Sequence, residues 1–99
     1  MIAEIHGILD TATSAQAQET INHYLKEGHN KVIINLSNTD YMSSSGLRVL
    51  LATAKRLWAD NGTFKVCHPN KVIKDILDTS GFSVIMDVTE TEEEALQGM

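Results

Sequence analysis

The sequence predicts a small α/β fold in which a sheet of mostly parallel central strands alternates with helices. The hydrophobic pattern switches repeatedly between the alternation typical of strands and the three-to-four-residue spacing typical of helices. The connections between these segments are short, and strict alternation of strand and helix implies parallel strands joined by right-handed crossovers. The 99 residues are enough for one hydrophobic core. We therefore expect a single domain over residues 1–99, with the order β-α-β-α-β-α-β-α.

The first third of the chain predicts a strand, a helix and a second strand. Residues 2–9 alternate loosely between apolar and polar, which predicts a strand. Thr13 and Gln16 form a capping box in front of an amphipathic helix, and Gly28 is placed to end that helix in the left-handed conformation. Residues 31–36, KVIINL, are mostly β-branched and apolar, so they predict a central strand that is buried on both faces.

The middle of the chain continues this alternation after a turn that we expect over residues 37–40. Apolar side chains recur at helical spacing over residues 47–58, and Gly62 closes this second helix. Residues 63–68, TFKVCH, predict the third strand. Pro69 follows, where the first turn of another helix would tolerate it.

The last part of the chain predicts a helix, a strand and a short final helix. Residues 72–77 place their apolar side chains on one helical face, and Gly81 ends this segment. Residues 82–86, FSVIM, predict the last strand. Thr91, with Glu94 three residues later, predicts the capped start of the final helix.

Binding sites in open α/β sheets form beyond the carboxyl ends of the strands. This rule selects two loops, residues 10–13 after the first strand and residues 37–46 after the second. The second loop contains three consecutive serines, residues 43–45, followed by Gly46. Serine is a preferred N-cap, so helix capping is one interpretation of this run. The other is a phosphate site, because a helix N-terminus offers unpaired N–H groups and a partial positive charge.

Phosphorylation of a serine in the first helical turn would act through surface charge. A kinase can reach an exposed serine there without unfolding the protein, and the phosphate changes the charge by about −2. Asp10 is expected on the neighbouring loop and Asp40 lies just upstream, so the added charge would meet carboxylates. Gly46 is expected to leave the turn open to an approaching protein. The residues alone leave capping and phosphorylation both open.

Composition argues against several classes of function. Of the 13 acidic residues, five lie in residues 87–99, where there is no basic residue, and the remaining eight face eight basic residues elsewhere. No basic stripe exists to neutralise the phosphates of a nucleic acid, so we expect no nucleic-acid partner. The apolar runs are too short to cross a bilayer, and the N-terminus lacks the features of a signal peptide. A single cysteine, Cys67, fits a reducing compartment, so a cytoplasmic protein is expected.

No catalytic motif stands out in the chain. The serines do not form a G-x-S-x-G nucleophile elbow, and there is no P-loop. His6, His23, His29 and His68 lack the spacing of metal ligands, and Cys67 is interpreted as a small core residue. We therefore expect a protein that is not an enzyme and that carries neither a metal nor a cofactor.

Three blocks of sequence resemble the STAS domain family, whose best-known members are bacterial anti-sigma factor antagonists. The blocks are GILD (residues 7–10), VIINLSNTDYMSSSGLRVLL (residues 32–51) and LDTSGF (residues 77–82), and the resemblance extends over residues 2–95. It implies a partner that is both a serine kinase and an anti-sigma factor. The unphosphorylated domain would hold this partner and free a sigma factor, phosphorylation of one serine would release it, and a phosphatase would restore binding.

The resemblance also implies roles for individual residues. Ser44 falls on the phosphoacceptor of the family's Asp-Ser-Ser/Thr-Gly motif, and Ser45 and Gly46 fall on the next two positions. Asp10 matches the aspartate at the end of the family's G-x-L-D strand, which lies beside the phosphorylation loop. The implied phosphorylation-loop and partner-binding residues are Asp10, Asp40, Ser43, Ser45 and Gly46.

Some positions depart from the family pattern or match it more loosely. Asn35 falls on a polar position of the strand beside the loop. Ser43 stands where phosphorylated antagonists usually carry aspartate, which favours an alternative function as an accessory STAS module that is never phosphorylated, in a signalling or transport complex. The family pattern also leads us to expect a further strand before Ala3. Without that strand, unpaired backbone groups would favour pairing with another chain, so a homodimer is among our expectations.

Overall fold

The computed structural model describes residues 2–97, which form an α/β fold with a mostly parallel sheet and alternating helices, as predicted. The strands are β1 (Ile2–Glu4), β2 (Gly7–Leu9), β3 (Lys31–Asn35), β4 (Thr39–Met42), β5 (Thr63–Cys67) and β6 (Asp87–Thr89). The helices are α1 (Thr11–Lys26), α2 (Ser44–Ala59), α3 (Lys71–Thr79), α4 (Phe82–Ile85) and α5 (Glu92–Gln97).

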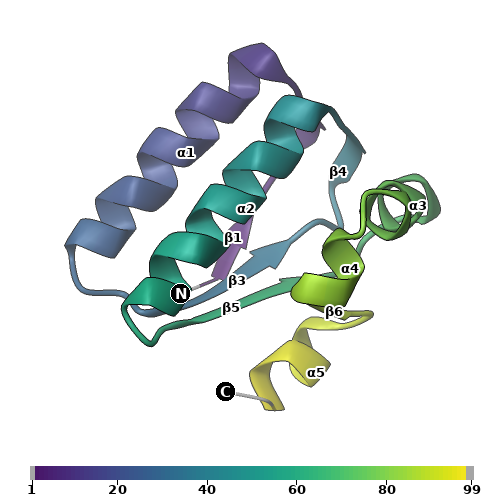
Figure 1. The fold of residues 1–99 in the computed structure, drawn as a ribbon. Coiled ribbons are helices and arrows are strands. Elements are labelled where there is room, and N and C mark those ends of the chain that lie inside the picture. Colours follow the sequence, from purple (N-terminus) through teal and green to yellow (C-terminus); the bar gives the residue numbers. More distant parts are fainter. Residues whose placement is uncertain (1, 98–99) are drawn as a thin grey trace.

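The main sheet has the strand order β1-β3-β5-β6, and all its neighbouring strands are parallel. Helices α1 and α2 lie side by side over one face of this sheet, and α5 lies on the opposite side (Figure 1). Strand β3 packs against apolar residues on both faces of the sheet. Val32 and Ile34 belong to the main core with α2 residues such as Leu50, whereas Ile33 belongs to a small second cluster with Cys67 and Ala95. The prediction of a central strand buried on both faces is therefore confirmed.

The segment predicted as one strand over residues 2–9 is divided between two sheets, so this prediction is wrong in part. Strand β1 pairs with β3, whereas β2 pairs with β4 in a separate two-stranded parallel sheet. The backbone shows where the chain changes partner: Ile5 N–H donates to Asn35 O (3.3 Å), but Gly7 N–H donates to Asn38 O (2.9 Å). The division carries β2 away from the main sheet and toward the loop that contains the serines.

Helix α1 begins before the predicted capping box, so the prediction of Thr13 as its N-cap is wrong. Asp10 is the N-cap, and its side chain accepts hydrogen bonds from the N–H groups of Ala12 and Thr13. Thr13 is instead the third helical residue, and its hydroxyl accepts a hydrogen bond from Asp10 N–H (2.9 Å). Asp10 rather than Thr13 is the N-cap because its carboxylate reaches the N–H groups of the first helical turn. At the other end Gly28 has φ +99°, as predicted for a left-handed residue after a helix.

The predicted turn over residues 37–40 is shorter than expected, because Thr39 and Asp40 already belong to strand β4. Thr39 is buried, and its hydroxyl donates to Ile5 O (2.6 Å), which fixes β4 beside the N-terminal segment. Strand β4 then leads directly into α2 through Ser43. The serines therefore follow a strand rather than a long irregular loop.

The last predicted strand, residues 82–86, is wrong. Phe82–Ile85 form helix α4, and the edge strand β6 begins only at Asp87. Phe82 and Met86 are one helical turn apart, and both pack into the main core, with Met86 N–H donating to Phe82 O (2.9 Å). Tertiary packing of this pair outweighs the local strand propensity of the segment.

Two expectations about helix starts in this part of the chain have different outcomes. Pro69 precedes the helix rather than lying in its first turn, because Asn70 is the N-cap of α3 and its side chain accepts from Ile73 N–H. The capped start at Thr91 is confirmed, since its hydroxyl accepts from Glu94 N–H (3.1 Å).

Candidate functional site

The two loops selected from the sequence lie side by side at one end of the molecule. Strands β2 and β4 are parallel neighbours that end together, with Leu9 opposite Met42. Ser43 N–H donates to Leu9 O (2.9 Å), and the hydroxyls of Thr11 and Ser45 are 3.1 Å apart. Helices α1 and α2 consequently begin next to each other and direct their N-termini toward the same end (Figure 1).

The three serines have different surroundings. Ser43 is the N-cap of α2, and its hydroxyl accepts from Gly46 N–H at 3.4 Å. Ser45 is half-buried and hydrogen-bonded to Thr11. Ser44 is exposed, and no described residue forms a hydrogen bond with its hydroxyl. The capping interpretation thus applies to Ser43, and Ser44 is the hydroxyl that another protein can reach.

The start of α2 is suited to hold an anion. Leu47 N–H bonds to Ser43 O (3.0 Å), but no described residue accepts from the N–H groups of Ser44 and Ser45. The first turn of α2 also carries no acidic residue that would occupy these donors. A phosphate near Ser44 would therefore gain hydrogen bonds and a favourable interaction with the helix dipole.

Gly46 does not open the turn to an approaching protein, so that expectation is wrong. It is buried, and a Cβ built there would lie 2.7 Å from Met42 Cγ and 2.9 Å from both Leu9 Cδ2 and Leu9 O. The absent side chain lets α2 approach β2 closely. Gly46 thus contributes to the site by allowing the start of α2, which carries the serines, to pack against β2, and it does not itself form a surface for a partner.

Asp10 lies beside the serines as expected, and it is also the N-cap of α1. Its carboxylate accepts from Thr13 N–H (3.1 Å), from the Thr13 hydroxyl (3.2 Å) and from Ala12 N–H (3.0 Å). These hydrogen bonds, chiefly those from Thr13, lower the pKa of Asp10 below its ordinary value. The carboxylate therefore stays ionised and provides a fixed negative charge on the loop next to Ser44.

Asp40 and Asn35 are placed differently. Asp40 is exposed on β4, and its backbone oxygen accepts a long hydrogen bond from Asn70 Nδ2 (3.4 Å). Asn35 is buried, accepts from Ser37 N–H (2.9 Å) and donates from Nδ2 to Glu92 Oε2 (2.8 Å). Asp40 therefore belongs to the surface beside the site, whereas Asn35 holds the turn after β3 to helix α5.

An apolar surface next to the serines was not identified from the sequence. Ile8 and Tyr41 are register partners on β2 and β4, and their exposed fractions are 51% and 49%. Their neighbours Leu9 and Met42 are buried, so alternation along the two strands directs Ile8 and Tyr41 outward. This pair, the Ile8–Tyr41 patch, could be found only by recognising that residues 39–42 form a strand that pairs with β2.

Three further observations concern the thiol of Cys67, metal binding and membrane-spanning helices. Cys67 is buried, and burial together with the nearby Glu92 carboxylate raises the pKa of its thiol to about 11. Within residues 2–97, no group of three or more His, Cys, Asp or Glu side chains could hold a metal ion. Over the same residues, no helix combines the length and the apolar character that are needed to cross a membrane.

Comparisons with known proteins agree with this fold. The sequence matches the STAS domain over residues 1–95. A protein named as an anti-sigma factor antagonist, BtrV of Bordetella bronchiseptica, is 30% identical over 95 residues, which cover 96% of this chain and 82% of BtrV.

Solved structures lead to the same family. A Thermotoga maritima protein described as an anti-sigma factor antagonist has a TM-score of 0.93 at 21% identity, over 98% of this chain and 84% of that one. The Bacillus cell fate determinant SpoIIAA in its phosphorylated form has a TM-score of 0.74 at 26% identity, over 97% and 86% of the two chains. The match in sequence over nearly the whole length, together with the fold, shows that this chain belongs to the STAS domain family.

Proposed function

We propose that this protein is an anti-sigma factor antagonist whose binding is switched by phosphorylation of Ser44. In the unphosphorylated state it binds a partner that is both a serine kinase and an anti-sigma factor, and the phosphorylated state releases that partner. The observation that carries the proposal is the difference among the serines: Ser44 alone of the three is exposed, and no described residue bonds to its hydroxyl. The relatives named as anti-sigma factor antagonists support the choice of partner.

The surroundings of Ser44 support a switch that acts through charge rather than through unfolding. A phosphate adds a charge of about −2, and the free N–H groups at the start of α2 can stabilise it without disturbing the helix. The ionised Asp10 carboxylate lies on the adjacent loop. A partner surface that accommodates one carboxylate would meet three negative charges after phosphorylation, which weakens the complex.

The Ile8–Tyr41 patch supplies the apolar contact in this proposal. Tyrosine is enriched among the residues that contribute most to the affinity of protein interfaces, and the buried centre of an interface is more apolar than its rim. The patch lies on the strands that lead into α1 and α2, so it can contact a partner at the same time as Ser44. Affinity and control then come from neighbouring but separate groups.

Ser43 is compatible with this mechanism although many phosphorylated antagonists have aspartate there. Serine and aspartate are both good N-caps, and Ser43 already caps α2. The replacement removes one negative charge from the loop, so the partner kinase of this chain must recognise the loop without that carboxylate. We further propose that residues 1–99 act as one domain in the cytoplasm, as a binding module and not as an enzyme, and that a serine phosphatase reverses the switch.

A second function is favoured by the same residue. An accessory STAS module of a signalling or transport complex would keep the fold and the Ile8–Tyr41 patch but would never be phosphorylated. In that case the serines serve as a helix cap and a contact to α1, and binding ignores kinase and ATP.

Mass spectrometry of the protein purified from its own cells separates the two functions. We expect one phosphate on the peptide that contains the serines, located on Ser44, and its loss in the Ser44→Ala variant. Ser45→Ala is the matched control, because the Ser45 hydroxyl is already engaged by Thr11 and its loss should leave the modification in place. A chain without phosphate under all growth conditions would exclude the switch and favour the accessory module.

A further inference from the structure

The outward face of helix α2 begins with Ser44 and continues with positively charged side chains. Arg48 lies four residues after Ser44, Lys55 lies seven residues further along, and all three side chains are exposed. At 3.6 residues per turn, these positions form one stripe along the helix. The sequence of α2 contains no Asp or Glu. The helix therefore presents an exposed hydroxyl that is followed by cations, with no carboxylate of its own to neutralise them.

The two arginines of the chain have different surroundings. Arg56 donates from Nη1 to Asn22 Oδ1 on α1 (3.1 Å), so its guanidinium is engaged in the contact between the two helices. No described residue forms a hydrogen bond or an ion pair with Arg48. The guanidinium of Arg48 is therefore free to bind a further group beside the serines.

Helix geometry directs the Arg48 side chain toward Ser44. Residues four apart on a helix are neighbours, with their Cβ atoms about 5–6 Å from each other. The Cα–Cβ bonds of a helix tilt toward its N-terminus, and long side chains lie over the preceding turn. The guanidinium of Arg48 consequently extends over the first turn of α2, where Ser44 stands. An acidic group four residues before a basic one is also the more favourable order of the two.

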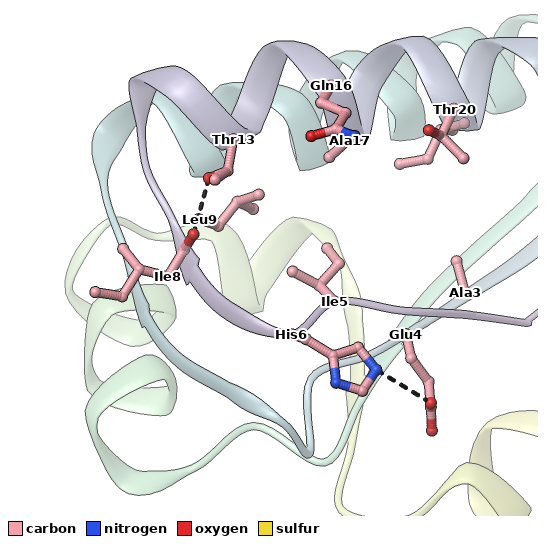
Figure 2. Close-up of a pocket in the computed structure, with 11 residues that line it drawn as sticks. Ala3, Glu4, Ile5, His6, Ile8, Leu9, Thr13, Gln16, Ala17 and Thr20 are labelled. Carbon is pink, nitrogen blue, oxygen red and sulfur yellow. Dashed lines mark hydrogen bonds and ion pairs between the residues drawn. The ribbon is translucent and has the colours of Figure 1, made fainter.

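The carboxylate nearest to this turn is held within its own loop. Asp10 caps α1 by accepting from the N–H groups of Ala12 and Thr13. The Thr13 hydroxyl also donates to Ile8 O (2.8 Å), which ties the first turn of α1 to strand β2 (Figure 2). Because the cap fixes the Asp10 carboxylate, the guanidinium of Arg48 stays available for a phosphate.

We propose that Arg48 binds the phosphate of phosphorylated Ser44, so that the modification removes a cation from the partner-binding surface as well as adding negative charge. This inference rests on the function proposed above, in which a kinase modifies Ser44. A planar guanidinium can donate to two phosphate oxygens at once. The N–H groups of Ser44 and Ser45, which no described residue occupies, contribute further donors from the helix N-terminus.

The two states of the surface then differ in more than their total charge. Before modification, Arg48 offers its donors to a carboxylate of the partner, one helical turn from the hydroxyl that the kinase modifies. After modification, the same donors are occupied from within the chain, and the charge of about −2 on the phosphate exceeds that of one guanidinium. A partner carboxylate that was attracted is then repelled. This reversal requires no movement of α2.

A ³¹P NMR titration of the whole protein, with phosphoserine incorporated at position 44 during synthesis, tests the contact. The second ionisation of phosphoserine has a pKa of about 6, and a bound guanidinium favours the dianion. We therefore expect the titration midpoint to rise by about 0.5 pH in Arg48→Gln. It should rise less in Arg48→Lys, because an ammonium group keeps the charge but not the bidentate contact. Equal midpoints in the wild type and Arg48→Gln would overturn the proposal.

Lys55→Gln is the matched control, because it removes the same charge from the same face of α2. Lys55 is eleven residues from Ser44, about 16 Å along the helix, whereas salt screens exposed charges over about 8 Å at physiological ionic strength. We expect its midpoint to equal that of the wild type. The carboxylates of Asp10 on the adjacent loop and Asp40 on β4 are the same in all these proteins. An equal rise in Lys55→Gln and Arg48→Gln would assign the effect to net charge and contradict the contact.

The Nε–H signals of the two arginines provide a second, direct readout in ¹H–¹⁵N spectra. Phosphoserine at position 44 should shift the Arg48 signal and slow its exchange with solvent, whereas Arg56, which is engaged by Asn22, should be unaffected. Arg48→Lys assigns the two signals. An Arg48 signal that is the same with serine and with phosphoserine would exclude the contact. Because synthesis supplies the phosphate, these results concern Arg48 alone, and mass spectrometry of protein from its own cells tests the proposed function separately.

Discussion

Replacing Gly46 by alanine is expected to destabilise the fold although alanine is the better helix former. The added Cβ would lie 2.9 Å from Leu9 O, 2.9 Å from Leu9 Cδ2 and 2.7 Å from Met42 Cγ. The two side chains can rotate away, but Leu9 O is a backbone atom that accepts from Ser43 N–H. Relief of the contact therefore requires that β2 and α2 move apart.

The expected size of this effect follows from two opposing contributions. Overpacking of a well-filled core costs about 1–3 kcal/mol, and the backbone contact places Gly46→Ala toward the upper end. Alanine recovers about 1 kcal/mol through its higher helix propensity. We expect the free energy of unfolding to fall by about 2 kcal/mol, which for a domain of this size lowers Tm by about 8–16 °C.

Urea unfolding at equilibrium measures this change, with Ser44→Ala as the control in the same helical turn. Ser44 is exposed and its hydroxyl bonds to no described residue, so its replacement should change stability by less than about 0.5 kcal/mol. If Gly46→Ala were as stable as Ser44→Ala, the close approach of α2 to β2 would be refuted.

Three further predictions concern groups near the site and in the core. The pKa of Asp10 is lowered in the folded state, so its ionised carboxylate stabilises the fold fully above the ordinary pKa of 3.8, and this stabilisation is lost as the pH falls through the folded-state pKa. In Asp10→Asn the free energy of unfolding should therefore fall less steeply with decreasing pH in the acid range. The same pH dependence in the variant and the wild type would contradict the role of Asp10 as a cap. Ser43→Ala should cost about 1 kcal/mol in urea unfolding whereas Ser43→Asp retains the cap, and equal losses would argue against capping. Cys67, whose pKa is raised to about 11, should react with a thiol reagent far more slowly in folded than in unfolded protein at mildly alkaline pH; similar rates would mean that it is not buried.

Segments with a strong local pattern were predicted well from the sequence. The run of β-branched residues in β3 can be accommodated only by a strand that is covered on both faces, and the helical spacing over residues 47–58 extends through most of α2. The strand prediction for Phe82–Ile85 was wrong because most of these residues individually favour strands. The helix that forms instead depends on contacts of Phe82 and Met86 with the main core. Such contacts leave no periodic signal in a segment this short.

From the sequence we expected Asp10 and the three serines to lie close together, as they do, but we did not expect the exposed apolar pair Ile8 and Tyr41 beside them. Asp10 and the serines stand at the ends of predicted strands, where a general rule directs attention. Strand β4 was missed because Asp40 interrupts its apolar pattern and because its partner is β2 rather than the main sheet. Without β4, the outward direction of Ile8 and Tyr41 could not be inferred. The role of Gly46 was also inaccessible, since a close approach between elements is a property of the assembled fold.

The small cluster of Ile33, Cys67 and Ala95 has a consequence for how the protein opens. Ala95 is the single buried residue of α5 within the described part of that helix, and the Asn35–Glu92 hydrogen bond is one of its few side-chain links to the sheet. Local detachment of α5 therefore exposes little of the main core. The amide protons of α5 should exchange with solvent long before those of β3 and β5. The same local opening uncovers Cys67. Its residual reactivity in the native protein would then report this partial unfolding and should be nearly indifferent to Gly46→Ala, which lowers global stability.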